Sequence, residues 1–283
     1  MATTVFLNGR WCPPEDAMVS VNDRGFLFGD AVYEATPAYG GRFLRLERHM
    51  TRLQQGLDAL RIAADVRTIE RCHFELLERN DLRREPWSMV YLQVTRGVAP
   101  RGHAFPAGDV QPTVYGFARA LTRPDRARWQ AGYAAITYPD LRWRRADLKT
   151  TLLLANVLAQ QAAVDAGVDD VILLRDSMAV EGSHANLFIV SNGALVTAPL
   201  DERVLPGVTR SIVIELAAGL SLEVHERDVS EADLRTAAEV LLCGTTTEIR
   251  PITSVNGEPV GGGAVGPITR QLYDAFQQHL LTL

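Results

Sequence analysis

One side-chain amine stands out among the residues that could carry out chemistry. Lysine and arginine together number 29, and Lys149 is the only lysine, which leaves 28 arginines. An amine can lose its proton and attack a carbonyl to form an imine, whereas a guanidinium keeps its charge. Arg142, Arg144 and Arg145 lie just upstream and would favour the neutral amine if they fold close to it. The alternative is a surface lysine that survived in an Arg-rich chain. We favour imine chemistry, because Lys149 lies between a strand-like segment and a strongly apolar helix.

Two hydroxyl-rich turns could bind a phosphate. The first, Pro206-Gly207-Val208-Thr209, opens directly into a helical pattern, where free amide groups and a threonine hydroxyl would face an anion. Taken alone, this turn fits ordinary helix capping better. The second, Gly244-Thr245-Thr246-Thr247-Glu248, follows an apolar strand, at the end where ligands gather in such sheets. Together the two turns could clamp one phosphate.

A carboxylate occurs in the polar turn Val180-Glu181-Gly182-Ser183-His184-Ala185-Asn186, between apolar strands. If Glu181 is buried there, it could bind and protonate a heteroaromatic nitrogen. The alternative is a hairpin glutamate in solvent. An imine-forming amine, a phosphate site and a carboxylate for a ring nitrogen are together what pyridoxal 5'-phosphate requires.

The elements that must position these residues form a mixed alpha and beta chain in two parts. We predict an N-terminal small α/β domain over 1–120, a connection over 121–130 and a cofactor-binding domain over 131–283. Residues 22–30 and 96–111 are predicted to be loops. Strands are predicted at 3–8, 17–21, 31–39, 88–95, 112–120, 133–138, 170–175, 186–191, 194–197, 222–225, 239–243 and 250–255, and helices at 44–62, 66–79, 151–166, 209–220, 231–237 and 267–281.

Composition restricts the class of protein. A hydrophobic content of 47% and a charged content of 22% are ordinary for a globular protein, and a net charge of -5 gives no reason to expect nucleic acid or an acidic membrane surface as partner. The three cysteines are far apart and not in a metal-ligand spacing, which indicates reduced thiols and no metal site. Without a signal-like start or a long apolar run, the sequence predicts a cytoplasmic protein.

Motifs along nearly the whole chain carry a family resemblance. The sequence resembles the class IV (fold type IV) pyridoxal-phosphate aminotransferases, and among them most closely the D-amino-acid transaminases. That resemblance implies a smaller N-terminal α/β domain and a larger C-terminal domain with a pseudo-barrel sheet. The matching stretches are Asp23 to Glu34, His49 with Arg52, Val94-Thr95-Arg96-Gly97, Arg101-Gly102-His103-Ala104-Phe105-Pro106, Asp147-Leu148-Lys149, Glu181-Gly182-Ser183, Gly207-Val208-Thr209-Arg210 and Thr245-Thr246-Thr247-Glu248-Ile249.

The resemblance also implies roles for single residues. Lys149 would bind the cofactor covalently and carry the proton, and Glu181 would pair with the pyridine nitrogen. The phosphate would be held by Arg52, Val208, Thr209 and Thr245. The substrate would be bound by Tyr33, Thr246, Arg101 and His103, the last two reaching across a homodimer from the other subunit to the α-carboxylate.

The resemblance implies ping-pong transfer of an amino group from a D-amino acid, such as D-alanine, to a 2-oxo acid, such as 2-oxoglutarate. The Arg101-Gly102-His103 stretch favours this activity, because branched-chain L-amino-acid aminotransferases, R-selective amine transaminases and aminodeoxychorismate lyases are not expected to carry it. A non-catalytic phosphate-ligand binding protein is the alternative from another class. His184 and Ala185 stand where serines are typical and Pro206 where a polar residue is, which leaves substrate breadth open.

Overall fold

The computed structural model describes residues 2–283, which divide into two compact units. The first unit runs through Arg123 and includes Leu148–Leu152 and the last residue, and the second comprises Pro124–Asp147 and Leu153–Thr282. The sequence assigned residues 148–152 to the C-terminal part instead. The difference has a backbone cause, because Tyr33 N donates to Lys149 O (3.0 Å) and Thr151 N donates to Ala31 O (3.3 Å).

The first unit is built on an antiparallel sheet with the strand order β2-β1-β6-β5-β3-β4. Its three long central strands pair from Ala31 opposite Thr95 to Ser88 opposite Ala120. The strands are β1 (Val5–Leu7), β2 (Arg10–Cys12), β3 (Ala31–Tyr39), β4 (Arg42–Phe43), β5 (Ser88–Thr95) and β6 (Thr113–Ala120).

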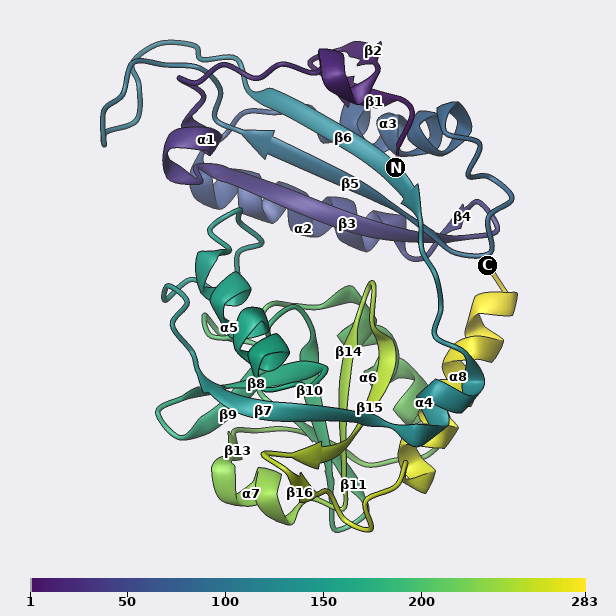
Figure 1. The fold of residues 1–283 in the computed structure, drawn as a ribbon. Helices are drawn as coiled ribbons and strands as arrows, with labels where there is room; N and C mark the ends of the chain where they lie inside the picture. Colours follow the sequence, from purple (N-terminus) through teal and green to yellow (C-terminus); the bar gives the residue numbers. More distant parts are fainter. Residues whose placement is uncertain (1) are drawn as a thin grey trace. The chain divides into compact units, whose positions relative to one another are not determined.

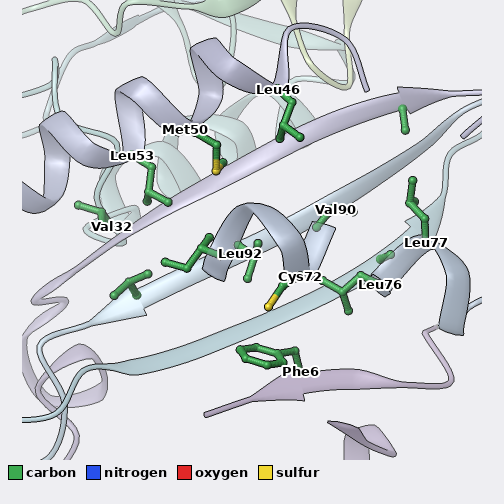
Figure 2. Close-up of a cluster of buried hydrophobic side chains, with 14 of the residues drawn as sticks. Phe6, Val32, Leu46, Met50, Leu53, Cys72, Leu76, Leu77, Val90 and Leu92 are labelled. Atoms are coloured by element: carbon green, nitrogen blue, oxygen red, sulfur yellow. The ribbon is translucent and has the colours of Figure 1, made fainter. Parts of the chain in front are cut away.

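Two helices, α2 (Leu46–Leu60) and α3 (Val66–Arg79), cover one face of this sheet (Figure 1). Apolar residues recur along α2 at helical spacing, and Leu46, Met50, Leu53 and Leu57 are all buried. Figure 2 shows how Leu46, Met50 and Leu53 meet side chains of α3 and of the sheet in one core, to which Leu57 also belongs. Burial of this stripe removes apolar surface from water and so stabilises the unit.

The segment before β3 differs from the sequence-based prediction. Residues 17–21 form no strand, and a short 3-10 helix at Pro14–Asp16 precedes them. The predicted loop at 22–30 contains a short helix, α1 (Arg24–Phe28). Asp23 caps it by accepting a hydrogen bond from Gly25 N at 2.8 Å, and Gly29 ends it with a left-handed φ of 66°. Five residues are too few to show a helical period in the sequence.

Six strands of the second unit close into a barrel, in the ring order β7-β8-β9-β10-β14-β15. β15 returns to β7 in parallel, and the pair Glu181 and Asn186 joins β9 to β10. The ring confirms the pseudo-barrel expected for this part. Its strands are β7 (Tyr133–Pro139), β8 (Asp170–Arg175), β9 (Met178–Gly182), β10 (Asn186–Ser191), β14 (Glu239–Gly244) and β15 (Glu248–Val255). Four short strands pair outside the ring: β11 (Ala194–Thr197) with β10, β12 (Val224–Glu226) with β11, β13 (Val229–Ser230) with β9, and β16 (Glu258–Pro259) with β15.

Helices of the second unit are α4 (Arg126–Ala131), α5 (Leu154–Asp165), α6 (Val208–Gly219), α7 (Glu231–Thr236) and α8 (Pro267–Leu281) (Figure 1). α5 packs on β7 and β8, and this explains why β8 is apolar on both faces. Ile172 belongs to one buried cluster with Leu187 and Leu242, whereas Val171 and Leu173 belong to the cluster beneath α5. The predicted connection at 121–130 contains most of α4. The sequence-based prediction did not include β9, because the apolar run of this strand is only Met178-Ala179-Val180. No helix within residues 2–283 has the length and apolar character needed to cross a membrane.

Candidate active site

Lys149 lies in an extended segment that runs beside the first residues of β3. Val32 and Thr150 form an antiparallel bridge, and Tyr33 N donates to Lys149 O at 3.0 Å. This register brings the half-buried Lys149 amine to 3.4 Å from Tyr33 Oη and 4.4 Å from the centre of the Tyr33 ring. Two of the predicted site residues are therefore adjacent, and backbone pairing rather than side-chain packing aligns them.

A buried ion cluster lies on the other face of β3. Side chains alternate along a strand, so Glu34 points away from Tyr33 and towards α2. Its carboxylate accepts hydrogen bonds from Arg52 Nε and Nη2, both at 2.8 Å, and its Oε2 lies 2.8 Å from His49 Nδ1. Glu34 is fully buried and Arg52 is 9% exposed. Arg52, the residue that resemblance assigns to the phosphate, is thus held by a carboxylate.

Titration of this cluster follows from its burial. Burial alone would raise the pKa of Glu34, but the charge and hydrogen bonds of Arg52, followed by those of His49, hold this pKa far below its ordinary value. Burial lowers the pKa of His49, and the charges of Arg52 and Lys149 lower it further. The hydrogen bond and the charge of Glu34 act in the opposite direction but do not cancel this decrease. Glu34 is therefore an anion and His49 is neutral at physiological pH. The sequence did not single out Glu34, although strand alternation and the spacing of three between His49 and Arg52 point to such a cluster.

Glu181 lies where the barrel closes. Its Oε2 accepts hydrogen bonds from Asn186 Nδ2 at 3.0 Å and from Leu205 N at 3.2 Å, and Oε1 contacts Arg142 Nη1. Burial raises the pKa of Glu181, and the charge and hydrogen bond of Arg142 oppose that rise. The carboxylate is buried, as its proposed role requires, and is not a hairpin glutamate in solvent.

Arg142 has a different environment from the one suggested by the sequence. Its guanidinium pairs with the buried Asp140 through Nε at 2.8 Å and Nη2 at 2.9 Å, in addition to Glu181. Arg145 pairs with Asp147. Carboxylates thus compensate two of the three arginines that were expected to act on Lys149.

Three polar turns of the second unit meet around Asn186. Asn186 Nδ2 donates to Leu205 O at 2.9 Å as well as to Glu181, and a Cβ atom at Gly207 would overlap Asn186 Oδ1. A Cβ atom at Gly244 would lie 3.2 Å from His184 O, so the turn that begins at Gly244 packs against the turn after Glu181. The sequence included Asn186 in a polar turn but gave it no role, because its partners are distant along the chain.

The donors around these turns fit a phosphate. Gly207 is the N-cap residue of α6, and no side chain of residues 2–283 caps this helix, so its first amides are available to a ligand. Val208 and Thr209 are buried in the first turn of α6. In the second turn, Thr247 Oγ1 is buried with no hydrogen-bond partner among the described residues. Uncapped amides and an orphan hydroxyl are the donors that an anion needs.

The remaining predicted residues have less enclosed positions. Thr245 is half-buried and Thr246 is exposed at the end of β14. In the first unit, Arg101 and His103 are exposed on the loop between β5 and β6, and both contact the Phe28 ring, with Arg101 Cζ 5.2 Å and the His103 ring 5.8 Å from its centre.

The three departures from the family pattern are also located. His184 is exposed, and its Nδ1 lies 2.8 Å from Ser183 Oγ, whereas Ala185 is buried. Pro206 is half-buried immediately before the N-cap of α6. Each unit thus gathers its own share of the candidate residues: Tyr33, Arg52, Arg101, His103 and Lys149 in the first, and Glu181, Val208, Thr209, Thr245 and Thr246 in the second.

Comparison with known proteins identifies the family to which the chain belongs. D-alanine aminotransferase of Staphylococcus aureus (strain MSSA476) is 34% identical over 280 residues, which cover 98% of this chain and 97% of that protein. The crystal structure of branched-chain amino acid aminotransferase from Escherichia coli matches with a TM-score of 0.89 at 28% identity, over 98% of this chain and 94% of that one. The same enzyme from Thermobaculum terrenum, in its PLP-form, matches with a TM-score of 0.86 at 28% identity, over 99% and 94% of the two chains. A family model described as amino-transferase class IV matches residues 31–255, and the chain therefore belongs to the class IV aminotransferase family.

Proposed function

We propose that this protein is a D-amino-acid transaminase that uses pyridoxal 5'-phosphate and transfers an amino group from a D-amino acid, such as D-alanine, to 2-oxoglutarate. The observation that carries the proposal is the single lysine, whose Nζ lies 3.4 Å from Tyr33 Oη. The 34% identity to a D-alanine aminotransferase over nearly the whole chain supports the same activity. The chemistry of the Arg101-Gly102-His103 stretch also supports it, because a guanidinium and an imidazole suit an α-carboxylate.

Each candidate residue then has a chemical task. When bound, pyridoxal phosphate supplies an aldehyde for the amino group and a ring that accepts the electron pair of the α-carbon. Lys149 Nζ removes the proton from the α-carbon of the substrate. Glu181 keeps a proton on the ring nitrogen, and the hydrogen bonds from Asn186 and Leu205 hold the carboxylate in place for this task.

The other residues bind and orient. Arg52, the first-turn amides of α6 at Val208 and Thr209, and the hydroxyl of Thr245 would hold the phosphate. Tyr33, Arg101, His103 and Thr246 would hold the substrate. Because one site handles the amino acid and the 2-oxo acid in turn, the first product leaves before the second substrate binds.

A panel of amino donors tests the proposal against its nearest alternatives. D-alanine, L-leucine and R-1-phenylethylamine would each be offered with 2-oxoglutarate, and formation of glutamate would be measured. We expect D-alanine to be the fastest donor. R-1-phenylethylamine has no carboxylate for Arg101 and His103 to bind, and L-leucine has the opposite configuration at its α-carbon. Turnover of L-leucine without turnover of D-alanine would replace the proposal by a branched-chain aminotransferase. A colourless protein without borohydride-trappable cofactor would favour the non-catalytic binding protein.

We also propose that the protein is a homodimer in which α5 lies at the interface. Leu154, Val157, Leu158 and Val164 form an apolar stripe on α5 and are 72%, 59%, 48% and 60% exposed. The opposite side of α5 is buried on the barrel through Ala159 and Ala163. A stripe of this kind on a protein surface is typical of an interaction site, and a second copy is the partner implied by the family resemblance.

Molar mass in solution tests the dimer. We expect the wild-type protein to have about twice the monomer mass of 31.1 kDa, and Val157→Asp to shift it towards the monomer by placing a charge in an apolar interface. Leu281→Asp is the matched control, since Leu281 is 73% exposed on α8. A wild-type protein that is monomeric at micromolar concentration would contradict the proposal.

A cytoplasmic location is proposed because Cys12, Cys72 and Cys243 are all free and buried, as is usual for proteins of a reducing compartment. Recovery of the native protein only from a secreted or periplasmic fraction would contradict this location.

A further inference from the structure

The loop that carries Arg101 and His103 is fixed at its base. Arg24 N donates to Gly97 O at 2.9 Å, Ala99 N donates to Asn22 O at 3.3 Å, and Asp23 forms an isolated bridge with Val98. The first residues of the loop are therefore tied to the segment that begins α1. Backbone hydrogen bonds thus fix the position of these first residues, whereas residues 100–105, further along the loop, are exposed to solvent.

The exposed tip of the loop has its own attachment, which comes from the side chain of Arg24. Arg24 Nη1 donates to Gly102 O at 2.6 Å, and Gly102 lies between Arg101 and His103 in the sequence. Arg24 is only 3% exposed, whereas Arg101, Gly102 and His103 are all exposed. A buried guanidinium thus holds the centre of an otherwise solvent-exposed turn.

The Phe28 ring makes a second set of contacts between Arg24 and the tip of the loop. The Arg24 guanidinium lies 4.8 Å from the centre of the Phe28 ring, the Arg101 guanidinium lies 5.2 Å from it, and the His103 ring lies 5.8 Å from it. Cation and imidazole contacts with one ring restrict the directions that Arg101 and His103 can adopt. The two side chains that flank Gly102 therefore rest on a ring whose position is set by α1.

The orientation of Arg24 is itself determined. Arg24 Nε donates to Asp30 Oδ2 at 2.8 Å, and Arg96 binds the same carboxylate through Nε at 2.7 Å and Nη2 at 3.0 Å. Burial alone would raise the pKa of Asp30, but the hydrogen bonds and charges of Arg96 and Arg24 lower it, so Asp30 remains an anion. The Arg96 guanidinium also lies 3.7 Å from the centre of the Phe105 ring, further along the loop. The planar guanidinium of Arg24 spreads its donors over a rigid fork, so it reaches a carboxylate and a carbonyl while its charge lies near a ring, whereas the compact ammonium of lysine does not reproduce this geometry.

We propose that Arg24 is a positioning residue for substrate selection: by holding Gly102 O, it fixes Arg101 and His103 in the arrangement that binds the α-carboxylate. The inference rests on the proposed function, because it takes Arg101 and His103 as the residues that bind the carboxylate. Arg24 acts through them and is not placed in contact with the substrate. Holding the loop in its binding arrangement before the substrate arrives reduces the ordering entropy lost on binding.

A double-mutant cycle on the holoenzyme tests the proposal, with D-alanine and 2-oxoglutarate as substrates. We expect Arg24→Lys to raise KM for D-alanine about three- to tenfold, with kcat within about twofold and cofactor affinity unchanged. In the background of Arg101→Ala, which raises KM by itself, Arg24→Lys should have a smaller effect, because only His103 remains of the two side chains that Arg24 positions. Equal effects of Arg24→Lys in both backgrounds would overturn the inference.

A matched control and a second variant keep the test independent of folding. Arg79→Lys changes an arginine that also contacts an aromatic ring and a carboxylate, Trp11 and Glu75, but lies on α3. It should leave KM unchanged. If Arg24→Lys does not fold, Phe28→Leu removes the ring and leaves the Arg24 bond to Gly102, and it should raise KM more in the wild-type background than in the background of Arg101→Ala.

The outcomes separate this inference from the proposed function. Failure of the wild-type enzyme to use D-alanine, or an unchanged KM in Arg101→Ala, would refute the assigned substrate or its carboxylate site, and the inference with it. Normal results in those two arms, combined with an unchanged KM in Arg24→Lys and in Phe28→Leu, would refute the inference alone. Amide hydrogen exchange of residues 97–111 adds a readout without activity, and we expect faster exchange at the tip in Arg24→Lys than in Arg79→Lys.

Discussion

Replacing Lys149 by alanine is expected to lower kcat by about 10⁴-fold or more, which is the upper end of the contribution of a positioned general base. The chain offers no second lysine to take over the task. Tyr33, whose Oη lies 3.4 Å from Lys149 Nζ, could not replace it because a phenol does not form an imine with an aldehyde. The measurement is steady-state formation of glutamate from D-alanine and 2-oxoglutarate, together with the visible absorbance of the bound cofactor.

The matched control for Lys149→Ala is Lys149→Arg, which keeps the positive charge and loses the amine. Both variants should be inactive, and both should still retain cofactor non-covalently, because the proposed phosphate donors at Arg52, Val208 and Thr209 are unchanged. Borohydride reduction should leave cofactor on the Lys149 peptide of the wild-type protein and on neither variant. Near-normal turnover by Lys149→Ala would refute the central role of this amine.

The sequence was informative where a single residue type or a long period carries the signal. Lys149 is recognisable because arginine has taken every other basic position. Helices α3 and α8 have the predicted bounds of 66–79 and 267–281, since their apolar faces recur over three or more turns between clear end signals. Strands β5, β8 and β10 also have their predicted bounds, because each is a compact apolar or alternating run between polar turns.

Features that depend on contacts distant along the chain could not be predicted. Closure of the barrel between Glu181 and Asn186 depends on how six strands pair, and strands that are distant along the chain have no connecting turn to fix their register. The partners of Arg142 show the same limit. Its position seven residues before Lys149 suggested an effect on the lysine, but folding joins it to Asp140 and Glu181.

The two polar turns that follow Gly207 and Gly244 were recognised as a possible phosphate clamp, but how they are joined was not. Asn186 contacts the first turn, and the turn after Glu181 packs against the second, so the barrel closure supports both. Candidate site residues with a strong chemical identity can therefore be proposed from the sequence. The residues that support them are ordinary Asn, Arg and Glu side chains, and only the fold distinguishes these from surface residues of the same types.

Glu34→Gln is expected to lower the free energy of unfolding by about 3–5 kcal/mol at neutral pH, the range for breaking a buried ion pair from one side. The substitution keeps the shape of the side chain but removes the charge that two groups share. Arg52, bound by Glu34 through two hydrogen bonds at 2.8 Å, would remain charged and 9% exposed with its anion removed. His49 would lose the carboxylate that lies 2.8 Å from its Nδ1. Urea unfolding of the two proteins measures the difference.

A matched control and the pH dependence identify the cause of the Glu34→Gln effect. Glu75→Gln removes the carboxylate of an exposed pair with Arg79, whose side chains are 52% and 44% exposed, and should cost less than about 1 kcal/mol. Because the pKa of Glu34 is lower in the folded protein than its ordinary value of 4.5, its stabilisation is present above pH 4.5 and is lost as pH falls below it. The difference between wild type and Glu34→Gln should therefore shrink at acidic pH, as Glu34 takes up a proton. An equal difference at neutral pH and well below pH 4.5, or a loss no greater than that of Glu75→Gln, would show that the charge of Glu34 does not stabilise the first unit.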